Sequence, residues 1–274
     1  MRPKWIIAAP LFLATLLCNP FCERLAGQNV LPNPNAPKPS PPTISLSPAV
    51  IMLKAQPGAS SAHELKITNL TYSRLRFVLE ALDVVVRDDK RVFVPAGETE
   101  GGIARSAIFD PPAIELSPGQ ETQVTVTLTV PEHPAVRAVV ALFQGQTIMG
   151  SGPLTVTGSL GTLITYNLSS NVAITADTPK VIAETDSSNL TVSQGLKNTG
   201  SEPVVPHGTL AILDDQSGKL IGRVDIEPHR LLPGEKFNCA VEYPSSLKSG
   251  DYRAMISFED EGAVQTSAIK FKVP

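Results

Sequence analysis

The chain has 274 residues, of which 42% are hydrophobic and 18% are charged, so it can build the apolar cores of two domains of ordinary size. Its formal net charge at pH 7 is −3 and neither half carries a basic stripe, which argues against a nucleic-acid partner because neutralising phosphates requires clustered Lys and Arg. The 25 prolines and the low aromatic content of 5% predict many turns and strand boundaries rather than long helices.

The first segment, residues 1–27, has the order of a secretory signal peptide. Arg2 and Lys4 give a positive start, the stretch from Trp5 to Leu17 is apolar, and a pair of small residues at the end offers a cleavage site. The apolar stretch is shorter than the roughly 20 residues that a transmembrane helix needs. We therefore expect an exported protein, periplasmic or secreted, with no membrane span in the mature chain.

A spacer and then a β pattern follow the signal peptide. Residues 28–42 are rich in proline and too poor in apolar residues to fold, which predicts a polyproline-like spacer. From Thr43 onwards, short apolar or alternating runs are separated by Pro, Gly, Asn and Asp. The run Glu121 to Val130 alternates strictly, as a half-buried antiparallel strand does. This pattern predicts β-sandwich architecture.

The β-rich part contains an internal repeat. Ile67-Thr-Asn69 is echoed by Leu196-Lys-Asn198, and Leu116-Ser-Pro-Gly119 by Leu232-Pro-Gly234. The two Pro-Gly turns are about 115 residues apart, which is the length of a domain rather than of a solenoid unit. We therefore predict an all-β chain of two tandem immunoglobulin-like β-sandwich domains, residues 43–169 and 170–274.

The motifs of enzyme chemistry are missing from the sequence. The histidines are not spaced as metal-ligand pairs, and neither a Gly-x-Ser-x-Gly elbow nor a Gly-rich phosphate loop occurs. The acidic pairs Asp88-Asp89 and Asp214-Asp215 fall at expected hairpin ends, where Asp is favoured for turn hydrogen bonds. Cys239 lies in a strand-like run and is expected to be a small buried hydrophobe. We therefore predict no catalytic residues, no metal site, no cofactor and no enzymatic activity.

One segment is a candidate for binding a partner. From Leu154 to Leu168 the even positions are mainly apolar and the odd positions are mainly Thr, Ser, Gly and Asn. Such a strand can cover its own domain's core, or it can be an edge strand that pairs with an incomplete β partner. Under the second interpretation the partner-binding residues are Leu154, Val156, Leu160, Ile164 and Tyr166.

The first half of the chain resembles a known family. The residues that carry this resemblance are Ile67-Thr-Asn69 and Phe109-Asp-Pro-Pro112 with the following Leu-Ser-Pro-Gly119. They are similar to the N-terminal domain of periplasmic pilus-assembly chaperones (PapD-like). That resemblance implies two immunoglobulin-like domains and donation of an edge strand to pilus subunits. It also implies a basic pair that binds the subunit's terminal carboxylate; here Val50 stands about where the Arg is expected, and the candidate strand has no Lys or Arg.

A second resemblance covers both halves. Asp214-Asp215 with the following Gly-Lys219, the turn at Gly234, and Ser-Gly-Asp-Tyr252 are similar to the paired extracellular domains of WxL-type cell-surface proteins. This similarity implies binding to cell wall or matrix through loops.

The sequence thus leaves two functions open. The first is an exported, non-enzymatic, chaperone-like protein that binds an incomplete β-rich partner, such as a pilus-like subunit, by edge-strand donation during pilus or envelope assembly. The alternative is a cell-envelope binding or adhesion module that acts through its loops on a cell-wall component.

Overall fold

The computed structural model describes residues 43–149, 157–183, 190–244 and 247–274. The predicted signal peptide (1–27) and spacer (28–42) lie outside these ranges. In the described ranges, no helix has the length and hydropathy that crossing a membrane requires.

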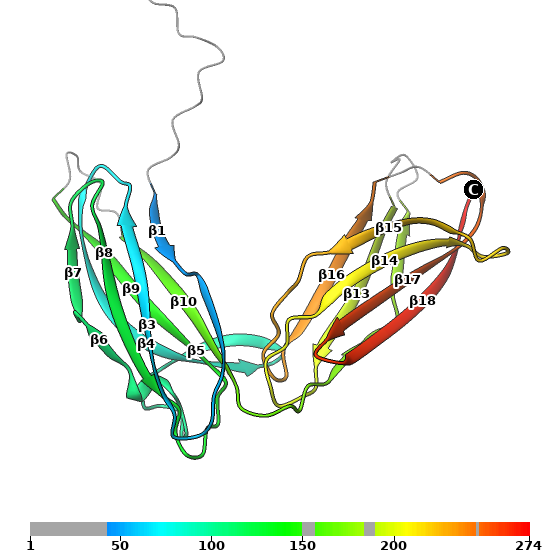
Figure 1. The fold of residues 1–274 in the computed structure, drawn as a ribbon. Coiled ribbons are helices and arrows are strands. Elements are labelled where there is room, and N and C mark those ends of the chain that lie inside the picture. The colour runs from blue at the N-terminus through cyan, green and yellow to red at the C-terminus, as the bar shows by residue number, and fades with distance from the viewer. Residues whose placement is uncertain (1–42, 150–156, 184–189, 245–246) are drawn as a thin grey trace, which may run out of the picture. The chain divides into compact units, whose positions relative to one another are not determined.

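The first half of the described chain forms two β-sheets (Figure 1). A single turn of 3-10 helix, Ala104–Ser106, lies between β5 (Lys90–Pro95) and β6 (Ile108–Asp110). One sheet has the strand order β1 (Ile44–Ser47), β3 (Ser60–Asn69), β8 (Glu121–Thr129), β6 (Ile108–Asp110). The other has the order β2 (Val50–Lys54), β10 (Thr157–Asn167), β9 (Ala138–Met149), β4 (Arg74–Arg87), β5 (Lys90–Pro95), with β7 (Ala113–Leu116) also paired to β4.

The second half repeats this arrangement with its own pair of sheets. In one, β13 (Leu190–Asn198) pairs with β11 (Ile174–Ala176), β12 (Lys180–Ala183) and β16 (Lys236–Tyr243). The other has the order β15 (Leu220–Ile226), β14 (His207–Asp214), β17 (Gly250–Asp260), β18 (Ala263–Val273). The chain therefore contains two immunoglobulin-like β-sandwiches in tandem, and the predicted fold class is confirmed.

Alternation along the strands builds the cores. In β8 the side chains of Val124, Val126 and Leu128 are at most 1% exposed, whereas the threonines between them are half-buried. Each fully buried Val or Leu side chain contributes about 1.5–3 kcal/mol of hydrophobic stabilisation. Strand β3 supplies Leu65 and Ile67 to the same core. The alternating pattern in the sequence is therefore the cause of the sandwich, because one face of each strand must leave water.

In the first sandwich, the Asn of the sequence repeat is Asn69, and its hydrogen bonds hold a turn in place. Asn69 is fully buried, and its Nδ2 donates to the carbonyls of Ser73 (2.8 Å) and Leu116 (3.0 Å). The amide of Gly119 donates to the Asn69 carbonyl at 2.7 Å. Gly119 has φ +76°, a conformation in which a Cβ would be strained, so the Pro-Gly turn needs its glycine.

The same set of bonds recurs in the second sandwich. Asn198 is also fully buried, and its Nδ2 donates to the carbonyls of Glu202 (2.8 Å) and Leu231 (3.1 Å). The amide of Gly234, at φ +82°, donates to the Asn198 carbonyl at 3.0 Å. The sequence repeat is thus a repeat of hydrogen-bonding geometry.

The chain changes sheets near its start. Strand β1 pairs with β3 in one sheet, whereas β2 pairs in parallel with β10 in the other, with Val50 opposite Leu163. Only Pro48 and Ala49 separate the two strands. This change of sheet decides which part of β10 has a neighbour on both sides.

Candidate functional site

Strand β10 has two halves with different surroundings. From Leu163 to Asn167 it lies between β9 and β2. From Thr157 to Thr162 it pairs with β9 alone, and no other described residue pairs with its second edge. Strand β10 is therefore covered by β2 from Leu163 to Asn167, and within the described residues its second edge is unpaired from Thr157 to Thr162.

The hydrogen bonds show which residues of β10 face the open edge. The Leu163 amide donates to the carbonyl of Ala49, and the Asn167 carbonyl accepts from Ala55, so odd-numbered residues face the β2 side. The Tyr166 amide donates in the opposite direction, to the segment that leads into β9. Neighbouring residues of a strand alternate in this direction.

The alternation continues without a bulge from Thr165 back to Thr157, because the pairing with β9 has an unbroken register there. The backbone groups of Thr157, Ser159 and Gly161 therefore point to the open edge. Each of these residues offers one N–H and one C=O to a further strand.

The predicted partner-binding residues fall into three groups. Leu154 and Val156 lie outside the described residues. Leu160 is half-buried in the open part of β10. Ile164 and Tyr166 are 0% and 1% exposed and belong to the hydrophobic core of the first sandwich. Their side chains are therefore committed to the fold, and contact of Leu160 with a partner stays a prediction.

Two buried threonines fasten β10 where its open part meets its covered part. Thr162, the last residue of the open part, donates from Oγ1 to the carbonyl of Pro48 at 2.7 Å. Thr165, in the covered part, donates from Oγ1 to the carbonyl of Ile51 in β2 at 3.2 Å. These side-chain bonds mark the boundary between the two parts.

Three hydrogen-bonded side chains lie at the margin of the core. The hydroxyl of Tyr166 lies 3.1 Å from Ser61 Oγ, which lies 2.9 Å from His63 Nε2. Burial raises the pKa of Tyr166 and lowers the pKa of His63. Both groups are therefore held in their neutral forms, as suits hydrogen-bonded side chains at the margin of a core.

Apolar side chains occupy the place where the family resemblance implies an Arg. Val50 lies opposite Leu163 and is 43% exposed, and Met52 is 42% exposed. Strand β10 carries no Lys or Arg. A basic pair in the positions that the resemblance implies is thus absent from β2 and β10.

Two arginines, Arg91 and Arg230, lie close together near Met52. Arg91 of β5 donates to the carbonyl of Arg230, and its Nε lies 2.8 Å from Glu235 Oε1. Burial and the neighbouring Arg91 lower the pKa of Arg230, whose Nη2 also lies 3.9 Å from Met52 Sδ. The two arginines are 139 residues apart in the chain, and no local pattern indicates that they meet.

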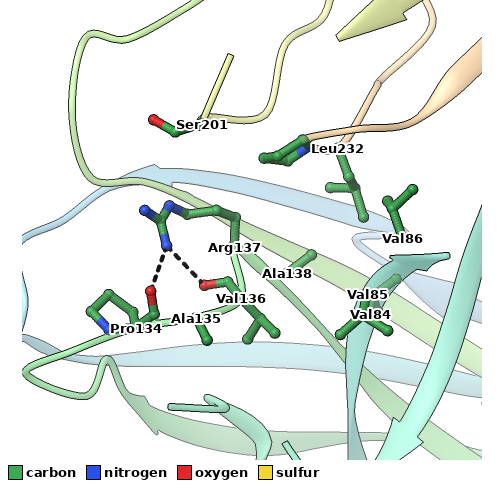
Figure 2. Close-up of a pocket in the computed structure, with 11 residues that line it drawn as sticks. Val84, Val85, Val86, Pro134, Ala135, Val136, Arg137, Ala138, Ser201 and Leu232 are labelled. Carbon is green, nitrogen blue, oxygen red and sulfur yellow. Dashed lines mark hydrogen bonds between the residues drawn. The ribbon is translucent and has the colours of Figure 1, made fainter. Parts of the chain in front are cut away.

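A carboxylate of the second sandwich holds the end of β10. Glu202 is fully buried, and its Oε2 lies 3.2 Å from Arg137 Nε and accepts the amide of Leu168 at 2.8 Å. Figure 2 shows Arg137 in the pocket here, donating to the carbonyls of Pro134 and Val136. The residue after β10 is therefore held by a charge-assisted hydrogen bond.

Other chemistry is sparse in the described ranges. No group of three or more His, Cys, Asp or Glu side chains that could hold a metal ion occurs among the residues that the structure describes. Cys239 is 3% exposed in β16, and burial raises its pKa, so it is the small buried hydrophobe that the sequence predicts.

Comparisons with known proteins found likenesses among solved structures alone. No family model and no curated protein matches the chain. The class 5 fimbriae chaperone CfaA matches with TM-score 0.42 and 12% identity, covering 85% of this chain and 100% of its own. The CsuC–CsuE chaperone–tip adhesion subunit pre-assembly complex from the archaic chaperone-usher Csu pili of Acinetobacter baumannii matches with TM-score 0.40 and 11% identity, covering 83% of this chain and 97% of its own. The E. coli chaperone DraB matches with TM-score 0.37 and 17% identity, covering 85% of this chain and 98% of its own. Pilus chaperones are thus among the solved structures to which this chain is similar. The similarity to WxL-type proteins stays a prediction.

Proposed function

We propose that this protein is an exported, non-enzymatic, chaperone-like protein that binds an incomplete β-rich partner through the edge of β10 during pilus or envelope assembly. The observation that carries the proposal is the unpaired edge of Thr157–Thr162 within the described chain. An exposed row of N–H and C=O groups is a template for adding a strand.

The strength of the open edge can be estimated. Thr157, Ser159 and Gly161 offer about six backbone groups, and each hydrogen bond contributes about 0.5–1.5 kcal/mol net. Association itself costs about 4–15 kcal/mol. Backbone pairing alone therefore gives at most weak binding, and the partner must also bury apolar surface. Among the described residues of the predicted apolar row, Leu160 is half-buried, whereas the others are buried in the core. Leu160 is therefore the one that can make this contact.

The covered half of β10 supports the same function. Its pairing with β2 and its core side chains hold the strand in place, so the open half is presented in an extended conformation before a partner arrives. A preformed strand loses less conformational entropy on binding than a flexible segment does.

The test uses a proline that removes one donor from the open edge. Ser159→Pro deletes the N–H that points away from β9 and leaves the pairing with β9 unchanged. Ser159→Ala keeps the N–H and is the matched control. The tagged mature chain is used to isolate bound material from its own host's envelope, followed by mass spectrometry.

We expect the wild-type chain and Ser159→Ala to retain a near-stoichiometric, exported, β-rich protein, and Ser159→Pro to lose it. Equal retention by all three chains would show that the β10 edge is not used. Recovery of wall material alone would instead favour the cell-envelope binding module. Circular dichroism of the three chains checks that each is folded.

A further inference from the structure

An apolar pocket lies on the outer face of the β10 sheet, directly beside the open edge. It has a volume of about 330 Å³, and Arg91 lies on its rim. The residues that line it and matter here are Leu82, Phe93, Val140, Leu142, Leu163 and Gly161. Phe93 is 56% exposed and lines the pocket together with these aliphatic side chains, so the pocket presents contiguous apolar surface to solvent.

Gly161 is the residue that connects this pocket with the edge. It is exposed, its backbone groups point to the open edge, and it has no side chain on the outer face. A Cβ at this position would lie 2.5 Å from Val140 Cγ2, which is a clash. The other glycine of the open half, Gly158, has nothing within 4 Å of the corresponding Cβ position.

A strand added at this edge would bring a side chain to the pocket. Residues directly opposite each other in neighbouring strands have Cβ atoms about 4.5–5.5 Å apart, and a large side chain opposite a glycine can lean over it. Because odd-numbered residues of β10 face outwards, the partner residue opposite Gly161 also faces outwards. Its side chain would lie over Gly161 and against Leu163 and Leu142.

The charges at the rim identify a second feature of the partner. Arg91 and Arg230 are close enough for Arg91 to donate to the Arg230 carbonyl, and one carboxylate, Glu235, pairs with Arg91. Among the described residues no carboxylate forms an ion pair with Arg230, and its Nε is buried without a hydrogen-bond partner. Arg91 lines the pocket and is neutralised by Glu235, whereas Arg230 lies beside Arg91, with its Nη2 3.9 Å from Met52 Sδ, and keeps its positive charge unpaired among the described residues. That charge is complementary to an acidic group.

We propose that the pocket at Gly161 selects the partner: it receives a large apolar, preferably aromatic, side chain from the strand that pairs with β10, and Arg230 with Arg91 receives a carboxylate of the same partner segment. This proposal rests on the proposed function, because the side chain arrives with a strand added at β10. It makes Gly161 a specificity-determining residue.

The test uses synthetic strand-length peptides as probes. Four Thr- and Val-rich peptides carry Phe or Ala at the centre and Glu or Gln beside it, and their dissociation constants for the mature chain are measured by NMR titration. Hydrogen exchange of the Ser159 and Gly161 amides reports in the same samples whether a peptide pairs with the edge. Gly161→Ala removes space at the pocket, and Gly158→Ala is the matched control. Leu142→Phe, which fills the pocket from β9, is the second variant should Gly161→Ala be unfolded.

We expect the Phe peptides to bind wild type about tenfold or more tightly than the Ala peptides, from the burial of one aromatic side chain. Gly161→Ala or Leu142→Phe should reduce this ratio to about twofold or less, and Gly158→Ala should leave it unchanged. Arg230→Gln should remove the preference for Glu over Gln and leave the preference for Phe.

Three outcomes overturn the proposal. If a peptide protects the edge amides but Phe and Ala bind equally, or if the ratio survives in both pocket variants, the pocket does not select the partner and the proposed function still stands. If no peptide at millimolar concentration protects Ser159 or Gly161, strand pairing at β10 fails, and the pocket proposal fails with it.

Discussion

The buried carboxylate of Glu202 lies 3.2 Å from Arg137 Nε, and these two residues join the two sandwiches where β10 ends. The Arg137 side chain is 19% exposed, so the pair is poorly hydrated. Removing one partner of such a pair leaves a charge that is buried and uncompensated.

We therefore expect Glu202→Ala to lower the free energy of unfolding by about 3–5 kcal/mol. Asp225→Ala is the control, since the pair of Arg223 with Asp225 is exposed and contributes at most about 1 kcal/mol. Urea unfolding followed by circular dichroism gives both values. A loss below about 1 kcal/mol for Glu202→Ala would contradict a stabilising role of this contact.

The open edge of β10 can be tested without a partner. The amides of Ser159 and Gly161 should exchange with deuterium rapidly, because they point away from β9, whereas those of Leu160 and Thr162 should be protected. NMR-detected hydrogen exchange of the mature chain measures all four. Equal protection along the strand would mean that a segment covers this edge in solution.

The repeated asparagines should be equally important in both sandwiches. Asn69→Ala and Asn198→Ala each leave two carbonyls without their Nδ2 donor in a buried site. Each carbonyl that loses its donor costs about 1–3 kcal/mol, so each variant should lose at least 2 kcal/mol or so. Calorimetry resolves the two domains if they unfold separately. A loss in one domain alone would show that the repeat is not energetically equivalent.

Asp83 should make stability depend on pH. It is fully buried; its Oδ1 accepts the amides of Ile103 and Ala104, and its Oδ2 has no hydrogen-bond partner. Burial raises the pKa of this carboxyl above its ordinary value of 3.8, although the two amide bonds act in the opposite direction. The folded state therefore holds the proton more tightly than the unfolded state does.

The stability that this protonation contributes is present below pH 3.8 and is lost as pH rises through the raised pKa. Asp83→Asn retains an acceptor for both amides and does not ionise. The stability of Asp83→Asn relative to wild type should thus increase as pH rises from 3.8, when urea unfolding of both chains is followed over this range. A constant difference would show that the two states bind the proton equally.

Much of the architecture follows from local sequence pattern. The strict alternation from Glu121 to Thr129 predicts β8 and its buried face, and the burial follows it residue by residue. The repeated Asn and Pro-Gly predict two copies of one domain, because Asn69 and Asn198 each close the same hydrogen-bonded turn. Such features depend on residues that are close in sequence or on a period of two, and both are visible in the amino-acid sequence.

The site could be predicted in part only. An alternating strand reveals which residues share a face, and Leu160, Ile164 and Tyr166 all stand at even positions of β10. The pattern does not reveal that β2, more than 100 residues earlier, covers the last part of β10 and leaves Leu160 beside an open edge. Whether a strand lies at the edge of a sheet depends on its pairing with distant segments, and the alternation of side chains along the strand does not indicate that pairing.

The order of residues is enough to predict the all-β fold, the tandem repeat and the apolar row of the candidate strand, because each shows as a recurring pattern of side chains along the chain. The unpaired edge of β10, the contact of Arg91 with Arg230 and the pocket at Gly161 come from the folded structure. They arise where segments distant in sequence pack together, and the free energy of that packing is not encoded in any one segment.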